Sequence, residues 1–464
     1  MHSEYRGKTS FIARERTLSY SKYIAHYPAL LKLGIPIMLG QFGTIVMGFA
    51  DTLMIGHHST QELAAAGFAN NIFGLVFITA MGYSYGLTPV VGALMGEGNI
   101  RYIAGKLKNS IFSNLLVGLF LMLIMGILYL NLHRIGLPEK LQPTIRPYYI
   151  TLWLSILPQM AFNGLKQFSD AIQDTKMPMW ILLGSNLLNI LGNWILIFGM
   201  FGLPEMGLLG AGIATLVSRI AMFLTFAIIF QFTCRYQEHR KNYRQSSITR
   251  VDQWELNKLG WPVALQLGME SASFSLSAIY IGWLGTNELA AHQIMITISQ
   301  LCFMLYYGMA AAVAVEVSFY RGANEIPKAK TVALSGLQLT WILGLCTTLP
   351  IFLLRSQIGG WFTDSAEVSR LVSLIAIPLV IYQFGDGMQS NYANALRGMA
   401  DVKPMIWIAF IAYFIISLPL GYFFGFVCKW ELVGVWMAFP FGLTSAGIMY
   451  MLRFHTHKYT FKLV

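Results

Sequence analysis

Charged residues are scarce in this sequence and occupy 11% of its 464 positions. A soluble globular protein carries about 25% charged residues, so this chain has too little polar surface to face water on all sides. Hydrophobic residues make up 56% of it, and the mean hydropathy is +0.57. Apolar runs of roughly 20 residues, the length that crosses a hydrocarbon core, follow one another almost without interruption. The composition predicts an all-α polytopic membrane protein.

The sequence also lacks the signatures of several enzyme classes. It contains no Walker P-loop, HExxH motif or nucleophile elbow, and its polar segments are too short to hold an ATPase domain. Its four cysteines show no CxxC pair or metal spacing, which argues against a disulfide framework: Cys234, Cys302, Cys346 and Cys428. We therefore expect neither an enzyme nor a cofactor. Uphill transport by this chain would need an ion gradient or a partner.

Twelve apolar segments are long enough to span a membrane, six on each side of a polar segment. The first six lie near 28–56, 63–95, 105–130, 143–170, 178–200 and 208–231. The second six lie near 255–284, 288–320, 328–354, 367–396, 404–427 and 432–453. We predict two pseudo-symmetric six-helix lobes with a linker and two tails: an N-lobe at 28–231, a linker at 232–254, a C-lobe at 255–454, and tails at 1–27 and 455–464.

Basic residues gather on one side of this arrangement, together with both tails and the linker. By the positive-inside rule this side is cytoplasmic. We expect a multi-pass protein of the inner (plasma) membrane, monomeric in the lipid bilayer, with both termini in the cytoplasm. The N-terminal tail is polar, so no cleavable signal peptide is expected. The net charge of +11 then reflects topology and not a nucleic-acid partner, although segment 235–250 could in principle touch RNA or anionic lipid.

The two halves of the chain repeat each other at a fixed offset, which pairs Gly34 with Gly260. The matches include a Leu-Gly-x-Pro motif and two single glycines: Leu33, Gly34 and Pro36 with Leu259, Gly260 and Pro262, Gly82 with Gly308, and Gly96 with Gly322. Because each half has six helices, both halves run in the same direction through the membrane. This parallel repeat is the plan of many secondary transporters, which place a site between the lobes. An enlarged scaffold is the alternative.

Three acidic residues lie inside long apolar runs: Asp51, Glu270 and Asp386. A carboxylate near the bilayer centre costs about 2.5–3.5 kcal/mol on insertion scales and usually faces a cavity or an ion path. Such groups can carry a proton or bind a hard cation such as Na⁺. A structural carboxylate bonded to a neighbouring helix is the alternative for each. The repeat does not share these acids, because Asp51 aligns with Ser277 and Glu270 with Thr44.

Other polar and aromatic residues give weaker signals. We expect Glu316, Asp170, Lys166 and Arg219 near cytoplasmic helix ends, with snorkelling or local pairing as their role. Apart from basic residues close to their ends, the predicted spans contain little positive charge beyond Lys166 and Arg219. Four residues of the eighth predicted helix could line a substrate cavity, although packing is favoured: Phe303, Met304, Tyr306 and Tyr307.

The sequence resembles the multidrug and toxic compound extrusion (MATE) family, and within it the NorM-like branch. The segments that carry the resemblance are GFADTLMIG (48–56), FSDAIQDTKMP (168–178), LLNILGNWILIFGMFG (187–202), ELAAHQ (288–293) and YQFGDGMQ (382–389). The resemblance implies a two-lobe exporter that exchanges cationic or amphipathic small molecules for Na⁺ or H⁺. It implies a C-lobe cation site, where Na⁺ could bind, at Glu270, Tyr382 and Asp386.

The same resemblance implies a proton-linked acid at Asp51 in the N-lobe. The polar network around it comprises Asn189, Asn193 and Thr215. In one branch of the family the position of Asn193 is a second aspartate. Asparagine cannot titrate, so the intact C-lobe pair favours Na⁺ slightly over H⁺.

Secondary active multidrug efflux is thus the leading hypothesis. A lipid-linked oligosaccharide flippase of the same superfamily is a second one, disfavoured because few cations lie in the predicted spans. A non-transporting receptor or scaffold is a third.

Overall fold

The computed structural model describes residues 22–132 and 141–459, and within these ranges the regular structure is helical. Ten of the helical stretches are long and apolar enough to cross a membrane. The broken stretch α6–α7 and the more polar α11 complete twelve spans, which confirms the predicted all-α fold. Most of the predicted N-terminal tail and half of the C-terminal tail lie outside the described residues.

The first half of the chain forms the N-lobe. Its helices are α2 (Tyr27–His58), α3 (Thr60–Ser84), α4 (Leu87–Gly96), α5 (Ile100–Leu130), α6 (Gln142–Leu154), α7 (Ile156–Ala171), α8 (Lys176–Ile197) and α9 (Gly207–Phe232), with a 3₁₀ turn η3 at Met200–Gly202. The linker holds the 3₁₀ turn η4 (Cys234–Tyr236) and the short helix α10 (Gln237–Gln245).

The second half forms the C-lobe. Its helices are α11 (Arg250–Leu284), α12 (Thr286–Gly322), α13 (Ile326–Ile358), α14 (Ala366–Gly398), α15 (Lys403–Ala409), α16 (Leu418–Tyr422) and α17 (Glu431–Thr456). The 3₁₀ turn η5 (Gly359–Trp361) follows α13, and two π-helical segments, η6 (Phe410–Ser417) and η7 (Phe423–Val427), make α15 and α16 one continuous span.

Two predicted spans are interrupted, and the linker is partly helical. The predicted helix 143–170 breaks at Ser155, shortly before Pro158, which cannot donate a backbone hydrogen bond within the helix. The predicted helix 63–95 breaks at Tyr85 and Gly86. In the linker, burial lowers the pKa of His239, whose ring packs edge-on against Phe168 with centroids 5.4 Å apart.

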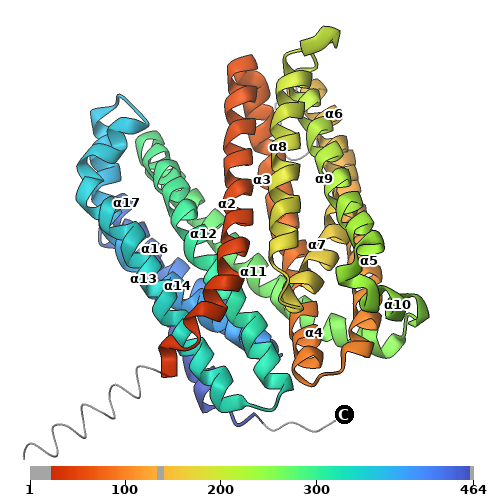
Figure 1. Ribbon diagram of the computed structural model, residues 1–464. Coiled ribbons are helices and arrows are strands. Elements are labelled where there is room, and N and C mark those ends of the chain that lie inside the picture. The colour runs from red at the N-terminus through yellow and green to blue at the C-terminus, as the bar shows by residue number, and fades with distance from the viewer. Residues whose placement is uncertain (1–21, 133–140, 460–464) are drawn as a thin grey trace, which may run out of the picture.

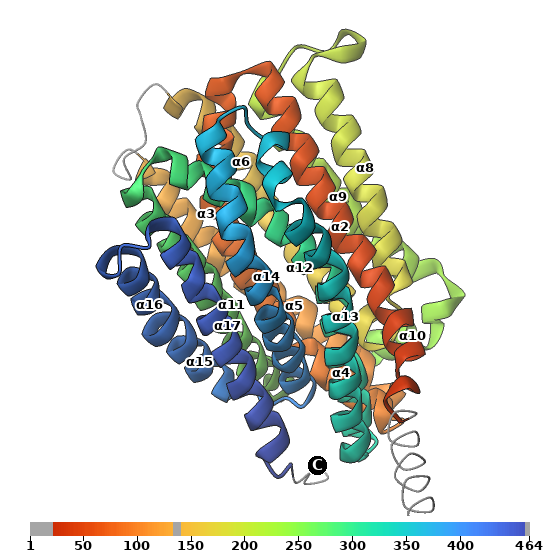
Figure 2. The same ribbon diagram turned by 90° about the vertical axis from the view of Figure 1, so that its left-hand side faces the viewer.

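Each lobe places its first helix against the other lobe: α2 packs on α12, and α11 packs on α3. Figure 1 shows the two groups of helices converging on the side that holds α4 and α10, which we call the linker side, and diverging toward the opposite side. Figure 2, turned by 90°, shows α15, α16 and α17 together at one flank of the molecule, away from α8 and α9.

The lobes meet on the linker side along a seam of repeated glycines. A Cβ atom added at Gly96 would lie 1.9 Å from the Phe319 carbonyl oxygen, and one added at Gly322 would lie 1.9 Å from the Ala93 carbonyl oxygen. Ala93 and Phe319 are themselves paired by the offset of the repeat, so the two contacts are symmetry mates. The repeated glycines therefore mark the positions where the two backbones touch.

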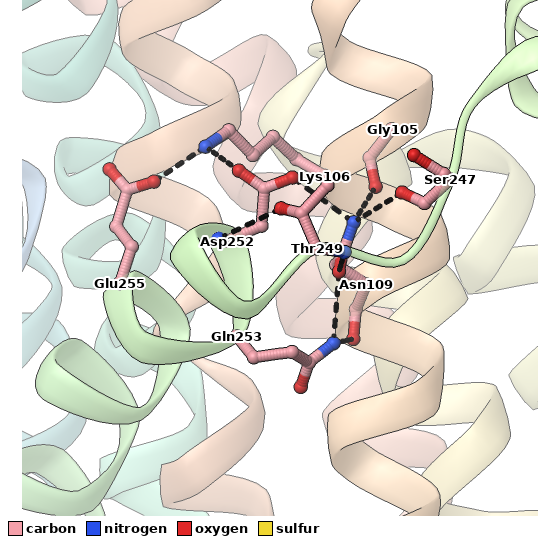
Figure 3. A network of polar contacts seen from close by, with 8 residues as sticks. All are labelled: Gly105, Lys106, Asn109, Ser247, Thr249, Asp252, Gln253 and Glu255. Atoms are coloured by element: carbon pink, nitrogen blue, oxygen red, sulfur yellow. Dashed lines mark hydrogen bonds and ion pairs between the residues drawn. The ribbon is translucent and has the colours of Figure 1, made fainter.

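Two clamps fasten the first helix of each lobe to the third helix of the other lobe. At the start of α11, the Thr249 amide donates to Asn109 Oδ1 (3.0 Å), and Lys106 Nζ reaches Asp252 Oδ1 and Glu255 Oε2, both at 2.6 Å. Figure 3 shows this network joining α5 to α11. The symmetry-related clamp, between α2 and α13, is uncharged.

In the uncharged clamp, Ser335 Oγ donates to the Tyr23 carbonyl oxygen (3.0 Å) and the Tyr27 hydroxyl donates to Gln338 Oε1 (2.7 Å). The offset of the repeat places Tyr23, Tyr27 and Ser335 opposite Thr249, Gln253 and Asn109. The fold thus repeats the clamp but not its charges.

Candidate functional site

The two acids of the C-lobe lie in one polar cluster between α11, α12, α14 and the π-helical segment η6. Glu270 Oε2 accepts hydrogen bonds from Gln266 Nε2 (2.9 Å) and from Gln389 Nε2 (3.2 Å). The same Gln389 amide donates to the Tyr413 hydroxyl (3.0 Å). Glu270 and Asp386 are close enough to repel each other electrostatically. The structure therefore brings together two acids that lie on different helices and far apart in the sequence.

Asp386 is 6% exposed and is bonded to a tyrosine of the neighbouring helix α12. The Tyr306 hydroxyl donates to Asp386 Oδ2 (2.5 Å) and lies 2.7 Å from Gln383 Oε1. Tyr382 lies one turn before Asp386 on α14 and is 2% exposed; its ring packs against Phe439 and Trp436, at 6.1 and 6.2 Å between centroids. Tyr306 thus contacts the acid directly, a role that the sequence did not indicate.

One guanidinium group lies near Glu270, one of the two acids. Arg397, in the last turn of α14, is 4% exposed, attracts Glu270 and donates from Nη2 to Gln266 Oε1 (2.8 Å). The sequence-based placement of Arg397 in a loop beyond the tenth span is wrong, because α14 continues to Gly398. Positive charge inside the C-lobe was therefore underestimated.

The N-lobe acid has a different environment. Asp51 Oδ1 accepts a hydrogen bond from Asn193 Nδ2 (2.5 Å). With its amide oriented so that both ends are satisfied, Asn189 also donates to Asp51 (2.9 Å) and accepts from Thr215 Oγ1 (3.2 Å). The predicted network of Asn189, Asn193 and Thr215 therefore does assemble around Asp51.

Arg219 provides the positive charge of this N-lobe cluster. It attracts Asp51, donates from Nη1 to Ser155 Oγ (2.7 Å) and stacks 4.2 Å from the Phe77 ring centroid. It lies midway along α9, not near a helix end as expected, because Asp51 and the Phe77 ring offset the cost of burying it.

The balance of buried charge differs between the two clusters. With all groups ionised, Asp51 and Arg219 cancel, whereas Glu270 and Asp386 outnumber Arg397 by one negative charge. An unbalanced buried charge is unfavourable in a medium of low dielectric constant. The C-lobe cluster is therefore suited to take up one monovalent cation.

Carboxylate, hydroxyl and amide oxygens suit a hard cation such as Na⁺. Among the described residues, no group of three or more His, Cys, Asp or Glu side chains is arranged to hold a metal ion. A Na⁺ ion at Glu270 and Asp386 would need further oxygen ligands from hydroxyls, amides, the backbone or water. Tyr306 and Gln383 already stand beside Asp386.

A cavity of about 30 Å³ lies between the lobes, next to the glycine seam. Its polar lining comes from both lobes: Tyr85, Thr88, Lys166, Gln167 and Asp170 from one, and Tyr307, Asn394 and Arg397 from the other. Lys166 and Asp170 form a local ion pair (2.7 Å), as expected from the sequence. Of the four residues considered for a substrate cavity, Tyr307 lines this one, and Phe303 and Met304 are partly buried.

Sequence reasoning missed Gln266, Gln389, Tyr413 and Arg397. Gln266 could have been found, since it lies one turn before Glu270 and residues four apart share a helix face. Gln389, close after Asp386 on the same helix, carries the same signal. No local pattern indicates Tyr413, which reaches the cluster from another span.

A protein-family model described as MatE matches residues 36–195 and, a second time, residues 262–423. Among solved structures, a eukaryotic MATE transporter, AtDTX14, aligns with a TM-score of 0.84 at 19% identity and covers 94% of this chain and 97% of that one. A mutant of the Vibrio cholerae MATE transporter VcmN aligns with a TM-score of 0.83 at 18% identity, with the same coverage.

A third structure is described as the outward-facing conformation of a multidrug resistance MATE family transporter. It aligns with a TM-score of 0.84 at 19% identity and covers 92% of this chain and 94% of that one. At these identities the structural matches show a shared fold. The family match covers most of the chain, and its two segments start at Pro36 and Pro262, which the repeat also pairs.

Proposed function

This chain belongs to the MatE family of MATE transporters, and we propose that it is a secondary active multidrug efflux antiporter. It exports cationic or amphipathic compounds in exchange for Na⁺ or H⁺, by alternating access between its two lobes. The protein works as a monomer in the inner (plasma) membrane. Its linker side faces the cytoplasm, because basic residues gather there.

The main support for this proposal is the excess negative charge of the C-lobe cluster. Glu270 and Asp386 repel each other, and a bound cation relieves that repulsion. The stabilisation is available only where the cluster is open to an ion source, so ion binding can bias the equilibrium between two arrangements of the lobes. Asp51, which already faces Arg219, is the weaker candidate for the coupling site.

The two lobes can move relative to each other at the glycine seam on the linker side. Symmetry-related glycines let the lobes close tightly there, while the helices diverge on the opposite side (Figure 1). Rocking of one lobe against the other, about an axis in the plane of the membrane, would open the seam and close the opposite side. The two clamps join the lobes on the same linker side, so they add to its closure and must separate when the seam opens.

Efflux from proteoliposomes under separately imposed Na⁺ and H⁺ gradients tests the proposal. A fluorescent organic cation such as ethidium serves as substrate, and a neutral amphipathic dye extends the substrate class. One of the two gradients should drive efflux, and an ionophore that collapses it should stop efflux. Failure of both gradients would leave the receptor or scaffold hypothesis.

The flippase hypothesis needs several cations in the space between the lobes to hold a pyrophosphate group. Arg397 and Lys166 both line the inter-lobe cavity, but Lys166 is paired with Asp170. The remaining single guanidinium is less than such a substrate requires, so the antiporter is favoured.

A further inference from the structure

Arg397 stands between the C-lobe acids and the seam where the lobes meet. On one side, Nη2 donates to Gln266 Oε1 (2.8 Å), and the same Gln266 amide donates from Nε2 to Glu270 Oε2 (2.9 Å). The guanidinium is thus two hydrogen bonds away from the carboxylate. Since Gln266 uses both ends of its amide, a shift of either charged group is passed to the other.

On the other side, Arg397 reaches the N-lobe. Its guanidinium carbon lies 5.1 Å from the centroid of the Tyr85 ring, between α3 and α4. The Tyr85 hydroxyl is in turn 2.5 Å from the hydroxyl of Tyr307 on α12. This cation–π contact and this hydroxyl pair both cross the boundary between the lobes.

The facing wall of the inter-lobe cavity offers Arg397 a second negative charge. Asp170, on α7, is 4% exposed and lines the same cavity. Its Oδ2 pairs with Lys166, while its Oδ1 is buried without a hydrogen-bond partner among the described residues, as is Nε of Arg397. One orphaned acceptor and one orphaned donor therefore line opposite walls of one cavity.

We propose that Arg397 couples cation binding at Glu270 and Asp386 to closure of the linker-side seam. While the C-lobe site is empty, Glu270 attracts Arg397 through Gln266 and away from the N-lobe. A bound cation weakens that attraction, because it supplies a competing positive charge. The guanidinium then interacts more strongly with Tyr85 and Asp170, which strengthens closure of the seam.

This inference deepens the proposed function and rests on it. Arg397 acts as a positioning residue, because its effect passes through Glu270 on one side and Tyr85 on the other. It requires that an ion gradient drives efflux, which the proteoliposome experiment tests independently. Allosteric couplings of this kind are typically about 5–150-fold.

The test measures the distance between the lobes with and without the coupling ion. Spin labels are placed on Thr60→Cys and Thr286→Cys, two exposed, symmetry-related positions on the side opposite the linker, after Cys234, Cys302, Cys346 and Cys428 are replaced by serine. The protein is reconstituted in nanodiscs, and the ion is whichever of Na⁺ or H⁺ drives efflux. In the parent, the ion should raise the ratio of the long-distance to the short-distance population about fivefold or more.

Arg397→Gln should abolish this ion-driven shift while ion binding, measured by equilibrium dialysis or proton uptake, persists. Arg397→Lys keeps the charge and should restore part of the shift. Arg453→Gln is the matched control and should behave as the parent, since Arg453 pairs with Asp401 (2.8 Å) away from Glu270. If Arg397→Gln does not fold, Gln266→Leu, which cuts the same connection, takes its place.

A full shift in Arg397→Gln, or in Gln266→Leu, overturns the proposal and leaves Arg397 with a structural role. Neither result bears on the antiporter itself, which stands or falls on gradient-driven efflux by the parent protein.

Discussion

In the N-lobe one carboxylate, Asp51, faces one guanidinium, Arg219; in the C-lobe two carboxylates lie together, and one of them, Glu270, faces the guanidinium of Arg397. The repeat gives both lobes the same helical frame, the same glycine contacts and equivalent clamps. The buried charges are what differ. A duplicated frame can move symmetrically while its two halves do different chemistry, and the unbalanced half is the one that can gain free energy by binding a cation.

The largest expected effect on transport comes from removing the excess negative charge of the C-lobe cluster. Asp386→Asn and Glu270→Gln should each reduce drug resistance in an efflux-deficient host to background, a loss of about tenfold or more. Either change leaves one acid for one guanidinium, as in the N-lobe. Glu367→Gln, an exposed acid in the same lobe, is the control and should retain resistance. Resistance at the parent level in both variants would remove the proposed coupling site.

Substitutions in the glycine seam, which both lobes share, should reduce efflux nearly as much. Gly322→Val and Gly96→Val each place a side chain against a backbone carbonyl oxygen of the other lobe. Efflux should fall by about tenfold in both, since a backbone contact cannot give way as a side chain can. Gly282→Val, where nothing lies within 4 Å, should be neutral. Unequal effects at Gly96 and Gly322 would argue against a symmetric seam.

Replacing a buried acid should change the thermal stability in opposite directions in the two clusters. Asp386→Asn removes a repulsion and should raise the stability, whereas Asp51→Asn leaves Arg219 unbalanced and should lower it, each by about 1 kcal/mol. Adding Arg219→Gln to Asp51→Asn should recover part of the loss. Intrinsic tryptophan fluorescence during heating in detergent measures all three variants, and the same sign in both lobes would contradict the charge balance described here.

Features that depend on neighbouring residues could be predicted from the sequence, whereas contacts between distant helices could not. The spans, the repeat and the three acids follow from local hydropathy and from comparison at a fixed offset. The breaks at Ser155 and Tyr85 interrupt predicted continuous helices, since hydropathy does not register a turn inside an apolar run. Arg397 was misplaced because a helix end is uncertain by about a turn, and one more turn of α14 carries it from a loop into the lobe.

The contacts that define the site depend on packing between helices. Tyr306 on α12 and Asp386 on α14 are 80 positions apart, and no periodicity links them. Arg219 was expected near a helix end because its partner Asp51 lies on another helix, α2, and the sequence of α9 alone shows nothing that would offset a buried positive charge. The assignment to the NorM-like branch, the identity of the coupling ion and the role of Tyr382 stay predictions.

The smallest effect is expected at the charged clamp. Lys106→Gln removes its two ion pairs but keeps the uncharged hydrogen bonds that the other clamp also uses (Figure 3). Partly exposed pairs contribute about 0.2–1 kcal/mol, so efflux should change less than twofold. Raising the salt concentration should mimic the substitution. A loss as large as that of the glycine variants would show that the charges of the clamp, and not only its hydrogen bonds, hold the lobes.

The number of coupling ions bound per chain tests the charge balance most directly. Equilibrium binding of ²²Na⁺, or proton uptake if H⁺ is the coupling ion, is measured on purified parent, Asp386→Asn and Asp51→Asn proteins. One ion should bind to the parent and to Asp51→Asn, and none to Asp386→Asn. Loss of the ion in Asp51→Asn together with its retention in Asp386→Asn would contradict the account and place the coupling in the N-lobe.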